Sequence, residues 1–596
     1  MPVFIPTNGV EAMEVKVTLI QGNDLIAKDR NMMGKRTTSD PYCIVKLQTT
    51  MPGVGRTKPK TTTSTLGQTK TITKDLNPKW NESFTASLPC PVLQDPAAPP
   101  KLIFELYDHD KNGDDDCMGI LTLPLTDVTS KTSKDWYDIP KDSVKNAKGK
   151  LEIHLQTVVH SSTTLQSGNS FALPSDNIRI GLAWDLDKGK AVDLDAACVA
   201  LDNQGRVAMD YSVYYGNLTS PNESIVHSGD SKDGKSKGED ESIQFRLNQI
   251  PPSIVALYIV LTVASPRRYL SNVATARMTI WDESKPASVA PLAAFAPSKH
   301  IHSEDATALF LVRIARGGGG SSQWILQPIE HSHPTARDFG TLIPFFKSYT
   351  RDLIPNIKVD PKEIVSIMRK GGAIKIRDFC PGNVLPDAVT FGLSWDMNTL
   401  KGGKTIDLDA SCICLDAELQ CVDKVWYKQL QSDDGGIVHS GDQRRGDAVG
   451  DDECIAIILS KISKRIKYIG FVVNSYTGQE LDDVQRAACH LFDTETKTDI
   501  AMHTMSNCEI LNGHTALVMC VLYRVNTRGG SSDSDWCLKI VGQAAQGKNV
   551  KDNIDELQAY LEENLPAAPL EKSGTGVEEE IPVEAEMPTK VPIEAM

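Results

Sequence analysis

Residues 193–201 have the sequence DLDAACVAL, and residues 407–415 have the sequence DLDASCICL. Each stretch begins with two aspartates on either side of a leucine and continues with small and apolar residues. Side chains two residues apart share one face of a β-strand, so the two carboxylates of each stretch are expected on the same side. We therefore predict two strands that each present a pair of acids on one face.

The two stretches are part of a long internal repeat, which indicates a duplicated domain. Each copy is expected to close with a helix, around residues 340–353 and 552–563. Three further matches accompany the DLD pair: IGLAWD from Ile180 and FGLSWD from Phe391, IVHSGD at 225–230 and 437–442, and EDES at 239–242 with DDEC at 451–454.

The repeated acids predict metal sites. These motifs contain no balancing lysine or arginine, and converging carboxylates repel each other unless a cation lies between them. Ca²⁺ prefers such oxygen ligands. Acidic hairpin loops without a ligand are the alternative, and duplication by descent explains part of the recurrence. The predicted ligands are Asp193, Asp195, Asp230, Asp240 and Glu241 in the first copy, and Asp407, Asp409, Asp442, Asp452 and Glu453 in the second.

These blocks resemble the TerD family, which is found in tellurium-resistance and stress-response proteins. The family signature of GLxWD, DLDAS, HSGD and GDDE occurs as GLAWD, DLDAA, HSGD and GEDE in the first copy and as GLSWD, DLDAS, HSGD and GDDE in the second. The resemblance implies a β-sandwich with Ca²⁺ sites built from those acids. The first copy departs from the pattern at Ala197, where serine is usual, and at Glu239.

The first 160 residues have a different pattern. Apolar and polar side chains alternate over residues 14–20, 101–107 and 151–155, and turn signals such as Asn-Gly at 112–113 separate such segments. This alternation is typical of an antiparallel β-sandwich.

Two acidic clusters, at residues 29–40 and 107–116, flank predicted strands in this part of the chain. Two converging loops of this kind suit Ca²⁺, and solvated acidic turns are the alternative. Asp108-x-Asp110-x-Asn112-Gly113 matches the first half of an EF-hand loop. The EF-hand is rejected because Gly119 stands where its bidentate glutamate belongs, and because the segment before the loop alternates like a strand.

The first 160 residues resemble a C2 domain, the membrane-docking sandwich of protein kinase C and the synaptotagmins. The matching stretches are LIAKDRNMMGKRTTSDPYCIVKL, TKTITKDLNPKWNESF and LIFELYDHDKNGDDDCMGILTLPL. The resemblance implies two or three Ca²⁺ ions bound by five aspartates of two loops, although Asp114 or Asp115 could replace the last of them, and the first loop is longer than usual. When the motif of the family is matched to this sequence, the five Ca²⁺-binding aspartates fall on Asp29, Asp40, Asp108, Asp110 and Asp116.

In that family the two loops lie at one tip of the sandwich, and their aspartates are expected to make this tip an electrostatic switch. Without metal it is negative and repels anionic lipid, and bound Ca²⁺ reverses that sign. Each basic side chain near an anionic leaflet adds about 1 kcal/mol. A flexible apolar loop tip and a solvated strand face are the alternatives. The predicted membrane contacts are Met32, Met33, Lys58 and Lys60, within a candidate basic face that also includes Arg56, Lys70, Lys74 and Lys79.

The composition limits the class of protein. The chain has 596 residues, of which 40% are hydrophobic and 23% charged, so folded domains are expected almost throughout. Its longest apolar run, at 254–264, is about half the ~20 residues needed to cross a bilayer. The first 15 residues, MPVFIPTNGVEAMEV, have no basic segment followed by an apolar one, so they are not expected to be a secretory signal. A net charge of −14 disfavours nucleic acid as a partner, and 13 cysteines without a CxxC pair disfavour zinc ribbons and disulfides.

Three signals that resemble enzyme motifs are given structural interpretations. Gly317–Gly320 with its following serines lacks the GK[ST] of a phosphate loop. His227-Ser228 and His439-Ser440 are adjacent pairs in tight turns, which favours a structural turn over a nucleophile and base. His331-Ser332-His333 has no counterpart in the second copy. No catalytic residue is therefore predicted, and the protein is not expected to be an enzyme.

Together these patterns predict a mainly β protein, cytoplasmic and peripheral on membranes when calcium rises. We expect calcium as cofactor, docking on anionic phospholipid through the C2 domain, and two calcium-binding TerD domains as a platform for protein partners. A metal-dependent hydrolase or nucleotide-binding stress protein, and a calcium-independent scaffold, are the alternatives. The expected segments are a C2 domain at 1–159, a linker at 160–175, TerD-like domains at 176–356 and 386–565, a linker between them at 357–385, and a disordered acidic tail at 566–596.

Overall fold

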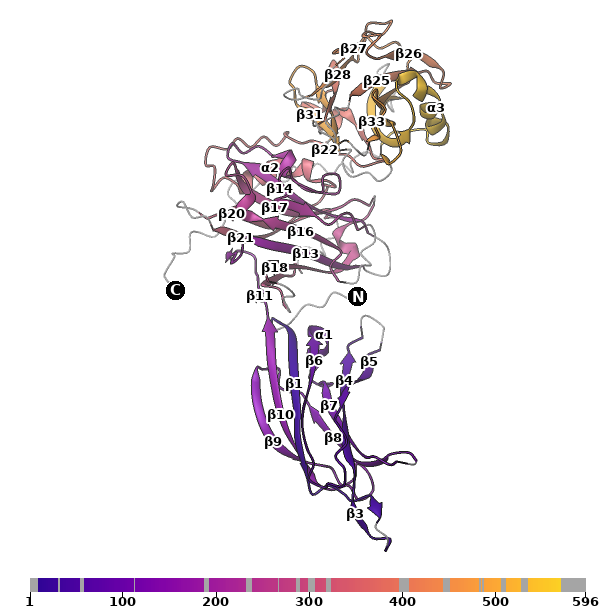
Figure 1. Cartoon of the computed structure of the whole chain (residues 1–596). Coiled ribbons are helices and arrows are strands. Elements are labelled where there is room, and N and C mark those ends of the chain that lie inside the picture. Colours follow the sequence, from indigo (N-terminus) through magenta and orange to yellow (C-terminus); the bar gives the residue numbers. More distant parts are fainter. Residues whose placement is uncertain are drawn as a thin grey trace. The chain divides into compact units, whose positions relative to one another are not determined.

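The structure is a computed structural model, and it confirms the prediction of a mainly β protein (Figure 1). By compactness the chain divides into two units: residues 1–165 with 178–184 and 277–296, and residues 166–177 with 185–276 and 297–596. The described residues are 9–30, 33–53, 58–111, 113–186, 192–231, 238–265, 267–285, 290–297, 306–317, 323–395, 407–442, 451–481, 484, 487–504, 511–526 and 534–569.

The first unit contains an eight-stranded sandwich of two antiparallel sheets, with strand orders β6-β1-β10-β9 and β5-β4-β7-β8. The predicted alternation is observed, because Leu102, Phe104 and Leu106 of β7 are fully buried while their neighbours are partly exposed. The strands are β1 (Val10–Asn23), β4 (Pro41–Met51), β5 (Lys60–Gln68), β6 (Lys79–Pro89), β7 (Lys101–Asp108), β8 (Asp116–Pro124), β9 (Lys131–Asp138) and β10 (Lys150–Ser161), joined by the short β2 (Asp29–Arg30), β3 (Arg36–Thr38) and α1 (Cys90–Leu93).

Strand register brings the two acidic loops of this sandwich to one end. Pro41, the first residue of β4, pairs with Asp108, the last residue of β7. The backbone N–H of His109 also donates to the carbonyl of Asp40, at 3.0 Å. The loop before β4 and the loop after β7 are therefore neighbours, as a two-loop cation site requires.

The first unit also includes strands of the first repeat. They are β11 (Thr163–Thr164), most of β13 (Asn177–Leu186), part of β18 (Val273–Asp282), and β19 (Ala293–Phe295), in the order β11-β19-β18-β13. Within this unit Glu11 of β1 accepts hydrogen bonds from the guanidinium of Arg277 and from the hydroxyl of Ser162. The C2-like sandwich is thus tied to these strands by buried polar contacts.

The second unit holds the remaining strands of the first repeat. A five-stranded sheet has the order β12-β21-β20-β17-β14, and β15 pairs with β16 in a hairpin. The bounds are β12 (Phe171–Ala172), β14 (Leu194–Asp202), β15 (Ile225–His227), β16 (Glu241–Arg246), β17 (Ile254–Val263), β20 (Ala308–Arg316), β21 (Trp324–His333) and α2 (Ile343–Tyr349).

The second repeat lies entirely in this unit and has two six-stranded sheets, β22-β31-β30-β24-β28-β27 and β23-β33-β32-β29-β25-β26. The order β23-β33-β32-β29-β25 repeats that of β12-β21-β20-β17-β14, as expected for a duplication. The bounds are β22 (Ser366–Ile367), β23 (Ala373–Lys375), β24 (Ala388–Ser394), β25 (Leu408–Leu415), β26 (Cys421–Val425), β27 (Ile437–His439), β28 (Glu453–Ile458), β29 (Tyr468–Ser475), β30 (Ala488–Asp493), β31 (Asp499–Thr504), β32 (Ala516–Asn526), β33 (Ser534–Ala545) and α3 (Ile554–Glu563).

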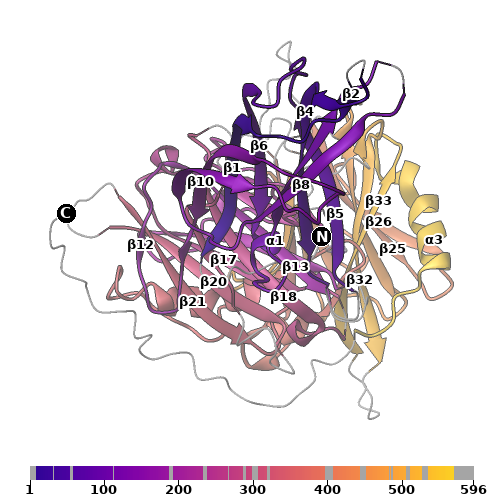
Figure 2. The ribbon, with the colours of Figure 1, turned by 90° about the horizontal axis from the view of Figure 1, so that it is seen from below.

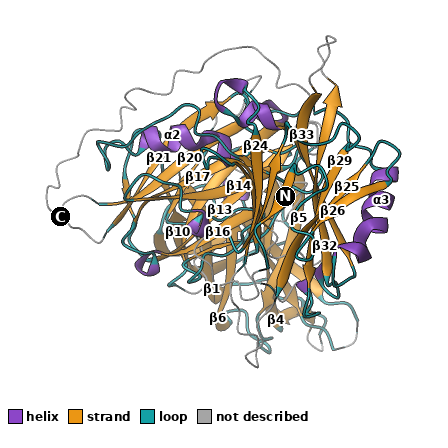
Figure 3. Ribbon diagram, turned by 90° about the horizontal axis from the view of Figure 1, so that it is seen from above, coloured by secondary structure: helices purple, strands orange, loops and turns teal. Residues whose placement is uncertain are grey.

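Both predicted closing helices are present, and each covers a sheet of its own repeat: α2 lies beside β20 (Figure 3), and α3 lies beside β25 (Figures 2 and 3). Phe346 and Tyr349 of α2 pack with Tyr258 and Phe310 of the first repeat. Leu557 of α3 is buried in the corresponding cluster of the second repeat. Among the described residues, no helix is both long enough and apolar enough to span a membrane.

The two predicted linkers need correction. Residues 160–175 contain β11 and β12, which pair with β19 and β21, and residues 357–385 contain β22 and β23, which pair with β31 and β33. These strands have two or three residues, too few for alternation to be recognised. Most of the predicted tail, from residue 570, and the loop at 318–322 lie outside the described residues.

Candidate metal sites

The paired aspartates of each repeat meet a third aspartate. The part of the chain that the structure describes contains two groups of at least three possible metal ligands whose ligand atoms all lie within 4.8 Å of one another. They are Asp193, Asp195 and Asp230 in the first repeat and Asp407, Asp409 and Asp442 in the second. The predicted strands are present, but only the second aspartate of each pair lies in one: β14 begins at Leu194 and β25 at Leu408, so Asp193 and Asp407 stand immediately before them.

A buried histidine fixes the third aspartate next to the strand. In the first repeat, the Nδ1 atom of His227 accepts from the N–H of Gly229 at 3.0 Å, and its Nε2 lies 3.2 Å from the carbonyl oxygen of Ala196. Gly229 has φ of 106°, a conformation that favours glycine. The HSGD motif therefore forms a tight turn attached to the DLD strand, which confirms the structural interpretation of this histidine.

His439 makes the same two contacts in the second repeat. Its Nδ1 accepts from Gly441 at 3.0 Å, and its Nε2 lies 2.8 Å from the carbonyl oxygen of Ala410. Burial lowers the pKa of His439 below its ordinary value, which keeps the ring neutral. A neutral ring protonated at Nε2 satisfies both contacts at once, since Nδ1 accepts and Nε2 donates.

The acidic turn of each repeat is the EDES stretch at 239–242 or the DDEC stretch at 451–454. The ligands predicted from this turn are not in the two groups. Glu241 accepts from the N–H of Ala196 at 2.9 Å and of Ser231 at 3.0 Å, and Glu453 accepts from Ala410 at 2.6 Å. Both glutamates are almost fully buried. They join the DLD strand to the acidic turn, so the structure gives them a positioning role. Asp452 accepts from the N–H of Trp395 at 3.0 Å, and Asp240 also lies outside the group.

The first acidic group is contacted by a basic side chain from outside the repeated motifs, that of Arg369. Nη1 of Arg369 lies 3.3 Å from Asp193 and 3.9 Å from Asp230, and Nη2 pairs with Asp195. The guanidinium lies over the ring of Tyr215, 3.8 Å from its centroid. Burial lowers the pKa of Arg369 to about 10, and Asp193 opposes that shift. Arg369 is 176 positions from Asp193, so no local spacing could have revealed it.

In the C2-like sandwich, Asp108 is the central acid. Its side chain is buried, Oδ1 accepts from the N–H of Asp40, and Oδ2 has no hydrogen-bond partner. Burial raises the pKa of Asp108 to about 6; the bond from Asp40 opposes this, and the charges of Asp29 and Asp110 add to it. A buried, unsatisfied carboxylate oxygen among other acids fits a hard cation.

The remaining acids of this tip have distinct surroundings. Asp116 lies directly opposite Asp108 in the β7–β8 register. Asp40 accepts from the N–H of Lys74 at 2.6 Å. Asp115, considered as a substitute for Asp116, instead accepts from the hydroxyl of Tyr42 at 2.7 Å and from the N–H of Asp110 at 2.9 Å, and these bonds lower its pKa. We therefore assign Asp115 to the loop's internal structure.

The predicted membrane contacts do not share one end of the sandwich. Met33 is 93% exposed in the first acidic loop, and Met32 lies outside the described residues. Lys60 pairs with Met51 at the far end of β4. At 3.3 Å per residue, the length of β4 puts Lys60 and its neighbour Lys58 roughly 30 Å from the acidic loops. The basic residues at the acidic end are instead Lys70, Lys74 and Lys79.

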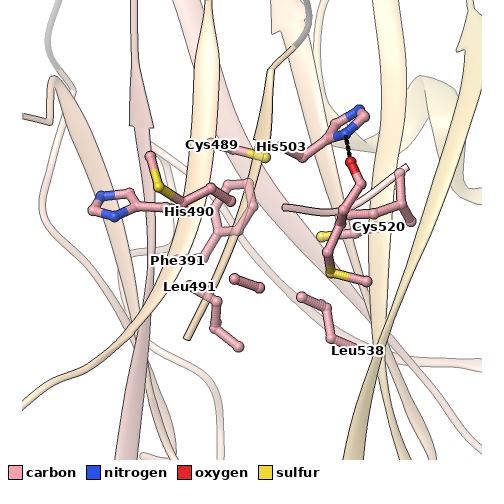
Figure 4. Close-up of a pocket in the computed structure, with 11 residues that line it drawn as sticks. Phe391, Cys489, His490, Leu491, His503, Cys520 and Leu538 are labelled. Atoms are coloured by element: carbon pink, nitrogen blue, oxygen red, sulfur yellow. Dashed lines mark hydrogen bonds between the residues drawn. The ribbon is translucent and has the colours of Figure 1, made fainter. Parts of the chain in front are cut away.

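A small cavity lies in the second repeat (Figure 4). It is lined mostly by apolar and sulfur-containing side chains, and its volume of about 10 Å³ is close to the minimum for one water molecule. His503 at its edge is hydrogen-bonded through Nδ1 to the carbonyl oxygen of Met368, at 2.9 Å. His490 points away from Phe391 and contacts Asp451 at 2.8 Å and Asp499 at 2.5 Å. The cavity is too small for a substrate.

These observations define the class of protein: a multidomain β-sandwich protein in which one sandwich precedes a duplicated pair. A family model described as "TerD domain" matches residues 162–333 and 365–553, together more than half of the chain, and one described as "C2 domain" matches residues 13–139. The chain therefore belongs to the TerD family and carries an N-terminal C2 domain.

Three relatives match individual domains of this chain. Tellurium resistance protein TerZ of Serratia marcescens is 34% identical over 170 residues, which cover 27% of this chain and 82% of the relative. General stress protein 16U of Bacillus subtilis is 30% identical over 187 residues, covering 30% of this chain and 91% of the relative. Extended synaptotagmin-2-A of Xenopus laevis is 30% identical over 152 residues, covering 25% of this chain but only 14% of that longer protein.

Proposed function

We propose that this protein binds Ca²⁺ and docks peripherally on anionic phospholipid membranes through its C2 domain, carrying the two TerD domains to that surface as a Ca²⁺-binding platform. It does not catalyse a reaction in this proposal. Its membership of the TerD family and its similarity to a general stress protein support a role in stress response.

The observation that carries the proposal is the buried carboxylate of Asp108. Its Oδ2 atom has no hydrogen-bond partner, and the charges of Asp29 and Asp110 already disfavour its ionised form. A divalent cation would satisfy that oxygen and neutralise the neighbouring acids. It would also remove the repulsion between this tip and an anionic leaflet, next to the exposed Met33 and the basic side chains of Lys70 and Lys74.

Co-sedimentation of the full chain with liposomes tests the proposal. Phosphatidylserine vesicles and neutral vesicles are compared across a Ca²⁺ titration, with Asp108→Asn/Asp110→Asn as the site variant. The matched control is Asp95→Asn/Asp127→Asn, which removes the same charge at the opposite end of the sandwich.

We expect Ca²⁺-dependent pelleting with the anionic vesicles alone, lost in the site variant and kept in the control. Pelleting without Ca²⁺, or equal loss in both variants, would contradict docking through this tip. The calcium-independent scaffold would then be the better interpretation.

A further inference from the structure

Arg369 connects the second repeat to the acidic group of the first. It follows β22, the short strand that pairs with β31 in the second repeat. Its side chain nevertheless contacts all three aspartates of the first group: Asp193, Asp195 and Asp230. The ring of Tyr215 supports the other face of the guanidinium, and this stacking fixes its plane beside the carboxylates.

The first repeat has no arginine at the position that corresponds to Arg369. The N–H of Met368 bonds to the carbonyl of Met502, just as the N–H of Leu165 bonds to that of Ala294 in the first repeat. The residue that corresponds to Arg369 is therefore Gln166, which is neutral. A cation at this position is specific to the segment that leads into the second repeat.

The same segment makes backbone contacts with the first repeat. The hydroxyl of Tyr215 donates to the carbonyl of Ile367 at 3.0 Å, and the N–H of Val365 donates to the carbonyl of Gly340 at 3.2 Å. These bonds hold residues 365–367 against the first repeat and direct Arg369 toward the acids. The arginine is thus positioned by its own segment as well as by charge.

We propose that Arg369 is a built-in cation that competes with Ca²⁺ for the first acidic group, an inference that rests on the proposed Ca²⁺ binding by the repeats. Ca²⁺ takes six to eight oxygen ligands at about 2.3–2.6 Å, so it needs the oxygens that Arg369 contacts. Occupancy by one cation therefore opposes occupancy by the other. By linkage, Ca²⁺ at this group weakens the docking of residues 365–369 on the first repeat.

Isothermal titration with Ca²⁺ tests the competition in the full chain. The background variant, Asp108→Asn/Asp110→Asn/Asp409→Asn, removes the C2 site and the second group. In this background Arg369→Gln should raise Ca²⁺ affinity about tenfold, the scale of a typical coupling. Lys370→Gln is the matched control, because it removes the same charge from the exposed neighbouring residue. Asp195→Asn should abolish the remaining binding.

Hydrogen exchange gives a second readout. Saturating Ca²⁺ should speed amide exchange of residues 365–368 in the natural chain, and should not do so in Asp195→Asn. Unchanged or weaker affinity in Arg369→Gln, or an effect equal to that of Lys370→Gln, would overturn the inference. Absence of Ca²⁺ binding in Arg369→Gln would overturn it too; the proposed function would still stand if the natural chain docked on anionic vesicles with Ca²⁺ and Asp108→Asn/Asp110→Asn did not.

Discussion

At the scale of single residues, His490 shows how a charged side chain stabilises the second repeat. Its ring nitrogens contact Asp499 at 2.5 Å and Asp451 at 2.8 Å, so one imidazolium bridges two carboxylates. Burial of the ring opposes its charged form, but the hydrogen bonds to the two aspartates outweigh burial and raise the pKa of His490 to about 9. The folded state therefore holds this proton more tightly than the unfolded chain does.

The bridge predicts a pH dependence of stability. Because the folded pKa of His490 is raised from 6.5 to about 9, its stabilisation is fully present below pH 6.5 and is lost as the pH rises through 9. His490→Gln should therefore lower the melting temperature at pH 6–7, at a cost of up to about 3 kcal/mol. The difference from the natural chain should vanish by pH 10. A difference that is constant from pH 6 to 10 would contradict this assignment, and His514→Gln serves as the surface control.

At the scale of elements, a buried glutamate joins the DLD strand to the acidic turn in each repeat. Glu453, at the start of β28, accepts from the N–H of Ala410 in β25 at 2.6 Å. Removing that acceptor leaves a buried N–H unsatisfied, which costs about 1–3 kcal/mol. Glu453→Ala should therefore lower stability in chemical denaturation, and Glu453→Gln, which keeps an oxygen acceptor, should recover most of the loss. Equal losses in the two variants would show that the negative charge matters more than the hydrogen bond.

The elements also show what the sequence could and could not reveal. Alternation predicted long strands such as β7, and the repeated DLD motif predicted the acids that converge, because both signals are local. Glu241 and Glu453 were predicted as ligands because composition does not distinguish a carboxylate that binds metal from one that binds backbone N–H groups. Strands as short as β22 have no detectable period. Arg369 and the aspartates that it contacts are far apart in the sequence and come together only in the folded chain, so no local pattern predicts the contact.

At the scale of the whole molecule, one buried ion pair ties the C2 sandwich to strands of the first repeat within the first unit. Glu11 of β1 pairs with Arg277 of β18, and their side chains are only 7% and 14% exposed. Ser162 donates to the same carboxylate. These contacts predict that the sandwich and the attached strands unfold together.

Calorimetry of the full chain tests that cooperativity. Arg277→Met leaves Glu11 buried without its guanidinium, and removing one partner of a buried pair typically costs about 3–5 kcal/mol. We expect a new transition at lower temperature, separated from the rest of the thermogram. Arg246→Met is the matched control, because Arg246 and Glu223 form a pair that is 40% and 70% exposed, and such pairs contribute little. An unchanged thermogram in Arg277→Met, or the same change in Arg246→Met, would show that the sandwich folds independently of the repeat. The Glu11–Arg277 pair would then not couple their unfolding.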